Sequence, residues 1–253
     1  MKNYLYQFFV KKLKNWTKFE LILWASCIVA VCTISIIFKS GVLIAACSLI
    51  GAASTFLQAK GKAVAQIFAI ITVVLYSLVS YAQGLYGEVL TYVVLMLPLA
   101  IASLISWVKN TDEEKTVKVR ELNKKQLMML PLYFVAEFVV VYFILKAINT
   151  SFLFASTLSV ATSVISVVLM IIRSKYGFVS FFIDEMTSII LWSFPIIVLG
   201  NLTLLPLLIN PIVNSINHLY GWKVWSAKIK RQREKKLMLE KELQASNEVE
   251  QKS

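Results

Sequence analysis

Two adjacent carboxylates, Asp184 and Glu185, lie inside a long apolar run that extends from Tyr176 to Leu199. In a helix they would lie roughly 12–14 Å from the start of the run. An ionisable group at that depth in a bilayer is costly and therefore indicates a function. Aromatic and hydroxyl side chains recur around the pair at helical spacing, namely Phe178, Phe181, Ser188 and Trp192. The pattern predicts a binding wall made of aromatic rings and carboxylates, which would suit a flat or cationic ligand. The alternative is that the carboxylates only hydrogen-bond to a facing helix.

The last apolar run carries Asn210, Asn214 and Asn217 at positions i, i+4 and i+7. One helical face thus presents three amides, each of which can donate and accept hydrogen bonds. Such a face suits the hydroxyls of a ribose or a carboxamide. Hydrogen bonding between neighbouring helices is an equal alternative.

Other polar residues in the runs have a structural interpretation beside the functional one. Thr72, Tyr76 and Ser80 form a polar stripe that we expect mainly to join helices. Glu88 begins the fourth run, where its charge complements the helix dipole and capping explains it adequately; the alternative is a place at the rim of an outer vestibule. Glu137 lies near the middle of the fifth run, and we expect it to pair with another helix.

Four prolines, at positions 98, 195, 206 and 211, interrupt the fourth, seventh and eighth runs. Proline removes a backbone hydrogen bond and kinks a helix. These positions are therefore candidate hinges for alternating access, or kinks that only fit the packing.

The sequence lacks the residues that common catalytic centres need. His218 is the only histidine, so neither a two-histidine metal site nor a histidine-based intramembrane protease can be built. No Gly-rich phosphate loop is present, which excludes transport driven directly by ATP within this chain. Cys27, Cys32 and Cys47 lie in the first two runs without metal-ligand spacing, so we expect free cysteines. We expect no enzyme, no cofactor and no metal.

The elements that must position these residues are long and apolar. The chain has 253 residues, 58% of them hydrophobic and 16% charged, with a mean hydropathy of +0.72. About 20 apolar residues in a helix span a hydrocarbon core about 30 Å thick, and the alternating segments of a β-barrel do not occur. The sequence predicts an all-α integral membrane protein with about eight transmembrane helices, at 19–38, 41–59, 63–83, 88–108, 127–146, 152–172, 176–199 and 202–221.

Basic residues are placed asymmetrically along this plan. With eight spans and a cytosolic N-terminus, all but two of the 26 lysines and arginines face the cytosol, Lys39 and Lys146 being the exceptions. This is the positive-inside distribution, so both ends are expected in the cytosol and the net charge of +12 does not indicate a nucleic-acid partner. The basic cluster at 228–236 is interpreted as a solvated topology anchor or as a contact with anionic lipid headgroups.

A weak internal repeat divides the spans. The basic turns after the second and sixth runs correspond, as do the tryptophans at the ends of the fourth and eighth. Three helices, one linker and three helices then form parallel repeats, a plan in which transporters bind substrate between the halves. The predicted division is a cytosolic N-tail (1–18), an extra transmembrane helix (19–38), a first repeat (41–108), a loop (109–126), a linker helix (127–147), a second repeat (152–222) and a basic cytosolic tail with an exposed helix (223–253).

Short motifs in both halves carry a resemblance to a known family. They are Ala59-Lys60-Gly61-Lys62, Tyr86-Gly87-Glu88-Val89, Ile183-Asp184 followed by Trp192, and Asn217-His218-Leu219-Tyr220-Gly221 closed by Trp225. With these motifs in this order, the chain resembles the PnuC family of bacterial vitamin transporters, which is typified by nicotinamide riboside uptake. The resemblance covers most of residues 41–225. The resemblance implies a SWEET-like fold in the bacterial cell membrane, and facilitated diffusion made one-way by phosphorylation of the vitamin in the cytosol. It also implies homo-oligomers, such as trimers.

Some positions depart from the family's pattern. Tyr92 and Ala100 stand where members often carry Asn and Gln, and Phe178 and Phe181 stand where tryptophans are common. Relatives in the family take thiamine, riboflavin or deoxynucleosides, which are therefore alternative substrates. Nicotinamide riboside and thiamine are cations, and the acidic pair favours either.

These observations lead to the hypothesis of a facilitator for a small aromatic, nucleoside-like vitamin, with nicotinamide riboside as its first candidate. The acidic pair would balance positive charge, rings of the seventh helix would stack on the ligand, and Asn214 and Asn217 would bond its sugar or amide. Tyr76, Glu88, Tyr92, Asn210 and Tyr220 complete the predicted binding set. Two alternatives are a membrane scaffold that holds a partner with its basic tail, and an intramembrane enzyme that uses the acidic pair.

Overall fold

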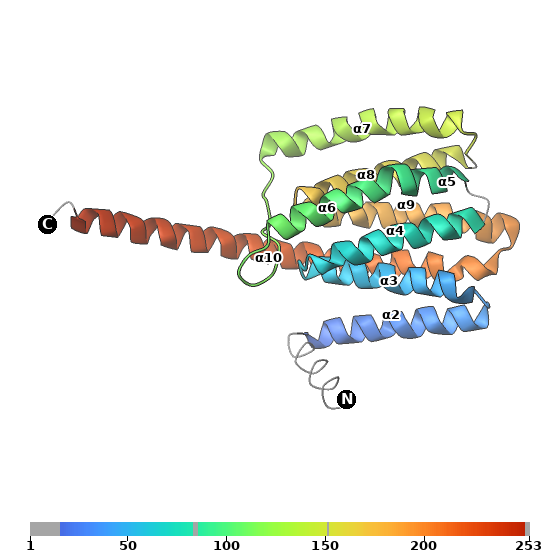
Figure 1. Ribbon diagram of the computed structural model, residues 1–253, viewed down its shortest axis with the longest axis horizontal. Helices are drawn as coiled ribbons and strands as arrows, with labels where there is room; N and C mark the ends of the chain where they lie inside the picture. The colour runs from blue at the N-terminus through green and yellow to red at the C-terminus, as the bar shows by residue number, and fades with distance from the viewer. Residues whose placement is uncertain (1–15, 83–85, 151, 251–253) are drawn as a thin grey trace.

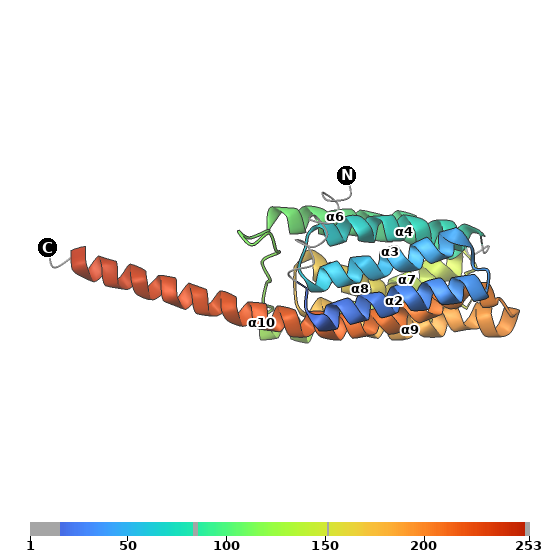
Figure 2. The same ribbon diagram turned by 90° about the horizontal axis from the view of Figure 1, so that it is seen from below.

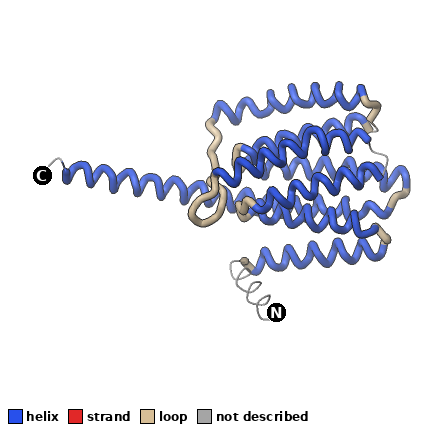
Figure 3. Tube along the Cα trace, viewed as in Figure 1, coloured by secondary structure: helices blue, strands red, loops and turns tan. Residues whose placement is uncertain are grey.

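The computed structural model describes residues 16–82, 86–150 and 152–250, and within them the chain is a bundle of long apolar helices (Figure 1). Eight of these helices are long and apolar enough to cross a membrane. The described residues contain two isolated β-bridges but no strand (Figure 3). The elements are α2 (Lys18–Ile37), α3 (Gly41–Ala59), α4 (Val64–Ala82), α5 (Tyr86–Leu90), η1 (Thr91–Met96), α6 (Leu97–Lys109), α7 (Lys124–Ala147), α8 (Leu153–Ile171), α9 (Tyr176–Leu199), η2 (Leu202–Leu204) and α10 (Leu205–Glu250).

The predicted all-α membrane fold is confirmed, and local sequence explains where the helices begin. Thr17 and Glu20 form a capping box before α2, and Asn123 and Gln126 form another before α7. Each box satisfies backbone N–H groups that a helix start leaves without partners. The fourth span is assembled from α5, η1 and α6, because a π-helical segment lies just before Pro98. Pro206 stands in the first turn of α10, where it does not interrupt the helix as the sequence had suggested.

Two groups of helices pack side by side to form the bundle (Figures 1 and 2). In the first group α3 and α6 both pack against α4, and in the second α8 and α10 both pack against α9. The groups join where α3 lies along α10 and α6 lies along α8. Helix α2 packs outside this core on α3 and α10, and α7 packs mainly on α8. The join between the two groups is therefore the interior of the molecule.

One end of the bundle, called here the basic end, carries the turn at Lys60, the segment 110–123 and the turn at Arg173 (Figure 1). Helix α10 leaves the bundle at this end and continues to Glu250 without a break between span and tail, with residues 233–244 exposed (Figures 1 and 2). Helix α2 begins at the same end. Both described ends of the chain therefore lie on one side of the bundle.

The segment 110–123 ties several elements together at the basic end. The Val117 backbone N–H donates to Gly61 O at 2.9 Å, and the Arg120 N–H donates to Arg173 O at 3.0 Å. Asp112 accepts a hydrogen bond from Lys228 of α10 at 2.8 Å. Partial burial opposes ionisation of Asp112, but the hydrogen bonds from Lys228 and Thr116 outweigh it and lower the pKa of this carboxyl below its ordinary value. The segment thus bonds to both helix groups.

A cluster of large rings closes the basic end of the interior. Trp107, Phe178 and Trp225 are almost fully buried and pack with Met170. The Trp107 indole N–H donates to Met170 O at 2.8 Å, which joins α6 to α8. Gly221 is essential to this packing, because a Cβ there would lie 2.5 Å from Phe178 Cε1. The cluster therefore depends on the close approach of α9 and α10.

We predict that Gly221→Ala lowers the free energy of unfolding by about 1–3 kcal/mol, because the new methyl overpacks the ring cluster. Thermal unfolding of the detergent-purified protein measures the loss. Adding Phe178→Leu should recover part of it, since the smaller side chain makes room. Equal stability of Gly221→Ala and wild type would contradict the packing described here.

Candidate functional site

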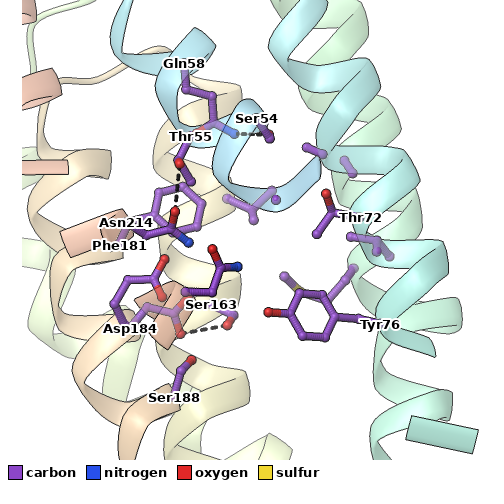
Figure 4. A pocket seen from close by; sticks show the side chains of 18 of the residues that line it. Ser54, Thr55, Gln58, Thr72, Tyr76, Ser163, Phe181, Asp184, Ser188 and Asn214 are labelled. Atoms are coloured by element: carbon purple, nitrogen blue, oxygen red, sulfur yellow. Dashed lines mark hydrogen bonds between the residues drawn. The ribbon is translucent and has the colours of Figure 1, made fainter. Parts of the chain in front are cut away.

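A cavity of about 170 Å³ lies inside the bundle, at the join of the two helix groups (Figure 4). Its lining comes from α3 and α4, from η1 and α6, and from α8, α9 and α10. The volume would hold on the order of ten waters, and so a small organic molecule. Met170 belongs both to the lining and to the ring cluster, so the cluster lies between the cavity and the basic end.

Asp184 supplies the acidic part of the wall. The hydroxyl of Ser163 donates to Asp184 Oδ1 at 2.7 Å (Figure 4). The hydroxyl of Thr162 lies 2.8 Å from the same oxygen. Both hydroxyls come from α8, which packs along α9. Among the described residues Oδ2 receives no hydrogen bond, and the residue lines the cavity. The carboxylate is thus held from behind while one oxygen stays available to a ligand.

Glu185, the neighbour of Asp184, is engaged by protein groups. Its Oε1 lies 3.2 Å from His218 Nε2 on α10, and His218 is almost fully buried. The His218 ring stacks on Phe181, with ring centroids 5.1 Å apart and an angle of 9° between the planes. This contact fixes Phe181 at the wall of the cavity. The two adjacent carboxylates therefore have different surroundings.

Amide and hydroxyl groups join the two helix groups at the cavity. The Thr55 hydroxyl of α3 donates to Asn214 Oδ1 of α10 at 2.9 Å (Figure 4). Asn217 lies behind this pair, with its Nδ2 3.5 Å from Thr55 Oγ1. Gly51 brings α3 close to α10, because a Cβ there would lie 3.2 Å from Asn210 Nδ2. Polar side chains from both helix groups thus meet next to the wall that carries Asp184.

Aromatic rings also line the cavity, and one of them, Tyr76, lies across the space from Asp184. Tyr76 of α4 and Tyr92 of η1 stack with centroids 5.6 Å apart, and Trp192 of α9 lies 6.2 Å from Tyr76. Figure 4 shows Tyr76 and Thr72 facing Asp184 across the space. Tyr92 owes its place to the π-helical segment, a local structure that often occurs at functional sites. A planar cation between these walls would meet rings on one side and a carboxylate on the other.

The structure brings most of the predicted site residues together. The cavity is lined by Tyr76, Tyr92, Phe181, Asp184, Glu185, Ser188, Trp192, Asn210 and Asn214. Phe178, Asn217, Tyr220 and Glu88 are not among its described lining residues. Ala100, one of the departures from the family pattern, does line it.

The residues outside the lining have other partners. Phe178 belongs to the ring cluster of the basic end. Tyr220 donates its hydroxyl proton to Glu20 Oε1 at 3.0 Å, and Glu20 also pairs with Lys60 at 3.0 Å. Glu88 is buried in α5, a helix that lies at the end of the bundle away from the basic end (Figure 1). Tyr220 and Lys60 thus tie α2 to the core.

Sequence reasoning missed the contribution of α3 to the cavity. Ser54, Thr55 and Gln58 line it, and so do Gln66 and Ser163. The signal was present, since Ser54 and Gln58 stand at i and i+4 and Gln58 donates to Ser54 Oγ at 3.1 Å. Thr72, which was expected mainly to join helices, also lines the cavity, while its hydroxyl donates to Phe68 O of its own helix at 2.8 Å.

The described residues contain no group of three His, Cys, Asp or Glu side chains that could hold a metal ion. The three cysteines are free. The groups that line the cavity can recognise a ligand by charge, by ring contacts and by hydrogen bonds.

Comparisons with known proteins connect the chain to membrane transport. The family described as nicotinamide mononucleotide transporter matches residues 41–227. The chain is 26% identical over 223 residues to a nicotinamide riboside transporter PnuC of Neisseria mucosa, covering 86% of this chain and 84% of that protein. It also shares its fold with a crystal structure of the vitamin B3 transporter PnuC, with a TM-score of 0.77 at 24% identity over 86% of this chain and 94% of that chain.

We predict that Thr55→Val lowers the free energy of unfolding by about 1–2 kcal/mol, because Asn214 then loses its hydrogen-bond donor. Thr72→Val is the matched control. It makes the same change at the same cavity, but the hydrogen bond described for the Thr72 hydroxyl stays within its own helix, so we expect a smaller loss. Equal losses in thermal unfolding would show that the bond between the helix groups contributes nothing.

Proposed function

The chain belongs to the nicotinamide mononucleotide transporter family, and on that premise we propose that it is a facilitator that carries nicotinamide riboside across the membrane. The relatives whose names support this proposal are the nicotinamide riboside transporter PnuC of Neisseria mucosa and the vitamin B3 transporter PnuC. The observation that carries the proposal is the cavity at the join of the helix groups, where Asp184 faces aromatic rings.

The chemistry of the ligand fits the walls of this cavity. Nicotinamide riboside contains a planar pyridinium cation, a carboxamide and ribose hydroxyls. The rings of Tyr76, Tyr92 and Trp192 offer stacking to the pyridinium, and Asp184 offers it an opposite charge. Asn214 and Gln58 are within the lining to bond the amide and the sugar. Each part of the vitamin thus has a partner of suitable chemistry.

The charges of the lining favour the riboside over its phosphate ester. No lysine or arginine is among the described lining residues, whereas Asp184 and Glu185 both are. A phosphate group in this space would meet like charge in a medium of low dielectric constant, without a compensating cation. We therefore propose the riboside as the transported species, although the family is described by the mononucleotide.

In this proposal the direction of transport depends on the orientation of the protein in the membrane and on trapping of the vitamin inside the cell. The basic end lies in the cytosol of a bacterial cell by the positive-inside rule, which places both tails there. The two helix groups, taken as parallel repeats, would rock about the cavity to open it to each side in turn. Phosphorylation of the vitamin in the cytosol would then prevent its return. We also propose homo-oligomers, as the family resemblance implies.

Other vitamins and a scaffold role are the alternative functions. Thiamine is also an aromatic cation and would use the same two walls, whereas riboflavin and deoxynucleosides would leave Asp184 without a positive partner. A scaffold would bind no vitamin at all. Uptake of each compound into proteoliposomes that contain the purified protein distinguishes these possibilities.

We predict that Asp184→Asn reduces nicotinamide riboside uptake into proteoliposomes by roughly 10–100-fold, because a charge-assisted interaction of about 1.5–3 kcal/mol is lost. Glu137→Gln is the matched control, since it neutralises a carboxylate on α7 outside the described lining of the cavity. Uptake that is unchanged in Asp184→Asn, or reduced equally in the control, would remove Asp184 from the site.

We also predict that a 100-fold excess of nicotinamide mononucleotide leaves riboside uptake within about twofold of its starting value, because the lining has no cation for the phosphate. Unlabelled riboside at the same excess should abolish uptake of the labelled compound. Strong competition by the mononucleotide would contradict the charge argument.

A further inference from the structure

Two cavities adjoin each other on the outside of the bundle at the basic end, away from the central site. The first, called here the basic pocket, has a volume of about 410 Å³ and lies between the segment before α7, the start of α9 and the extension of α10. Its lining residues are Arg120, Glu121, Leu122, Lys175, Tyr176, Ser226, Ile229, Lys230 and Arg233. Four cations thus surround one carboxylate.

The single carboxylate of the basic pocket, that of Glu121, already forms an ion pair with one of the four cations. Arg233 donates two hydrogen bonds to Glu121. Its Nε donates to Oε1 at 2.7 Å, and its Nη2 donates to Oε2. This contact lowers the pKa of Glu121 below its ordinary value. Among the described residues the one ion-pair partner of Lys230 is Glu234, at 4.0 Å, and both side chains are largely in solvent. The remaining positive charge of the pocket is therefore not balanced by the protein.

A hydroxyl in the wall of the basic pocket also lacks a partner. Ser226 Oγ is buried and makes no hydrogen bond among the described residues. Buried polar atoms are nearly always hydrogen-bonded, so such an atom beside a cluster of cations indicates a bound acceptor group. Both observations indicate an anion.

The second cavity, called here the apolar groove, has a volume of about 380 Å³ and lies between α7, α8 and α9. Leucine, isoleucine and phenylalanine side chains dominate its lining, among them Leu130, Phe134 and Ile165. From Tyr176 to Ile183 it extends for about 10 Å along α9, at the usual rise of a helix. That is about two thirds of one leaflet of the hydrocarbon core.

Tyr176 lines both cavities and marks the boundary between them. It is the first residue of α9, at the end of a membrane span, where tyrosines commonly lie at the level of the lipid headgroups. The basic pocket therefore lies at the headgroup level, and the apolar groove extends from it into the hydrocarbon. An anion alone would leave the groove unexplained, and an acyl chain alone would leave the cations unexplained.

We propose that these two cavities together form a binding site for an anionic phospholipid, with its phosphate in the basic pocket and an acyl chain in the apolar groove. Lys175, Lys230 and Arg120 contact the phosphate and Ser226 donates to it. The chain packs between α7 and α9. This site is separate from the vitamin cavity and does not depend on the transported substrate.

The test is native mass spectrometry of the delipidated full-length protein with added phosphatidylglycerol. We expect binding of this lipid to exceed that of phosphatidylcholine with the same acyl chains by at least tenfold. Glycerol phosphate, which carries the anion without the chains, should not bind at the same concentration. The double variant Lys175→Gln and Lys230→Gln should weaken phosphatidylglycerol binding about 30-fold, because each cation near an anionic headgroup contributes about fivefold.

Two further variants make the result specific. Lys235→Gln with Lys241→Gln removes the same charge from the part of α10 beyond the pocket and should leave binding unchanged. Val179→Trp fills the apolar groove from a partly exposed position that tolerates the change, and should also weaken binding. Thermal unfolding verifies that each variant is folded.

Several results would overturn the proposal. Equal binding of phosphatidylcholine would show that the cations are not used, and equal binding of glycerol phosphate would indicate a site for a soluble phosphate. Loss of binding in the control variant Lys235→Gln with Lys241→Gln would mean that the lipid responds to the overall positive charge of α10 and not to the basic pocket. If Val179→Trp instead separated an oligomer and left lipid binding intact, the groove would be an interface with a second copy.

Discussion

The cost of keeping a carboxylate inside a membrane protein is the constraint on which the centre of this structure depends. Asp184 lies deep in a span, and the hydroxyls of Thr162 and Ser163 meet one of its oxygens. The other oxygen has no protein donor among the described residues, so the charge is only partly compensated. In our account a cationic ligand supplies the rest.

The cavity lies at the join of the two helix groups, which contact each other both at its basic end and beside the cavity itself. Trp107, Phe178 and Trp225 close the basic end. Beside the cavity, the Thr55 hydroxyl of α3 donates a hydrogen bond to Asn214 of α10. These contacts differ in kind, since overlapping rings are hard to separate whereas a single hydrogen bond is easily exchanged with a ligand. A molecule that alternates between two open states needs contacts of the second kind beside the substrate.

Much of this arrangement could be predicted from the sequence, and the exceptions have physical reasons. The eight spans follow from the length of the apolar runs, and Asp184 and Trp192 follow from helical spacing. Periodicity, however, gives the faces of one helix and not its rotation against its neighbours. Phe178 and Phe181 lie one turn apart, yet Phe178 packs on Trp225 in the ring cluster, whereas Phe181 lines the cavity. The residues of α3 were missed because hydroxyls and amides in a span stand out less than charges do.

A structure of the protein with nicotinamide riboside bound tests the central claim most directly. We expect the pyridinium ring between Asp184 and the rings of Tyr76 and Tyr92, with a ring centroid within about 6 Å of an aromatic neighbour and the positive charge close to the free oxygen of Asp184. A ligand bound at any other place, or a cavity in which Asp184 stays away from the bound vitamin, would contradict the account.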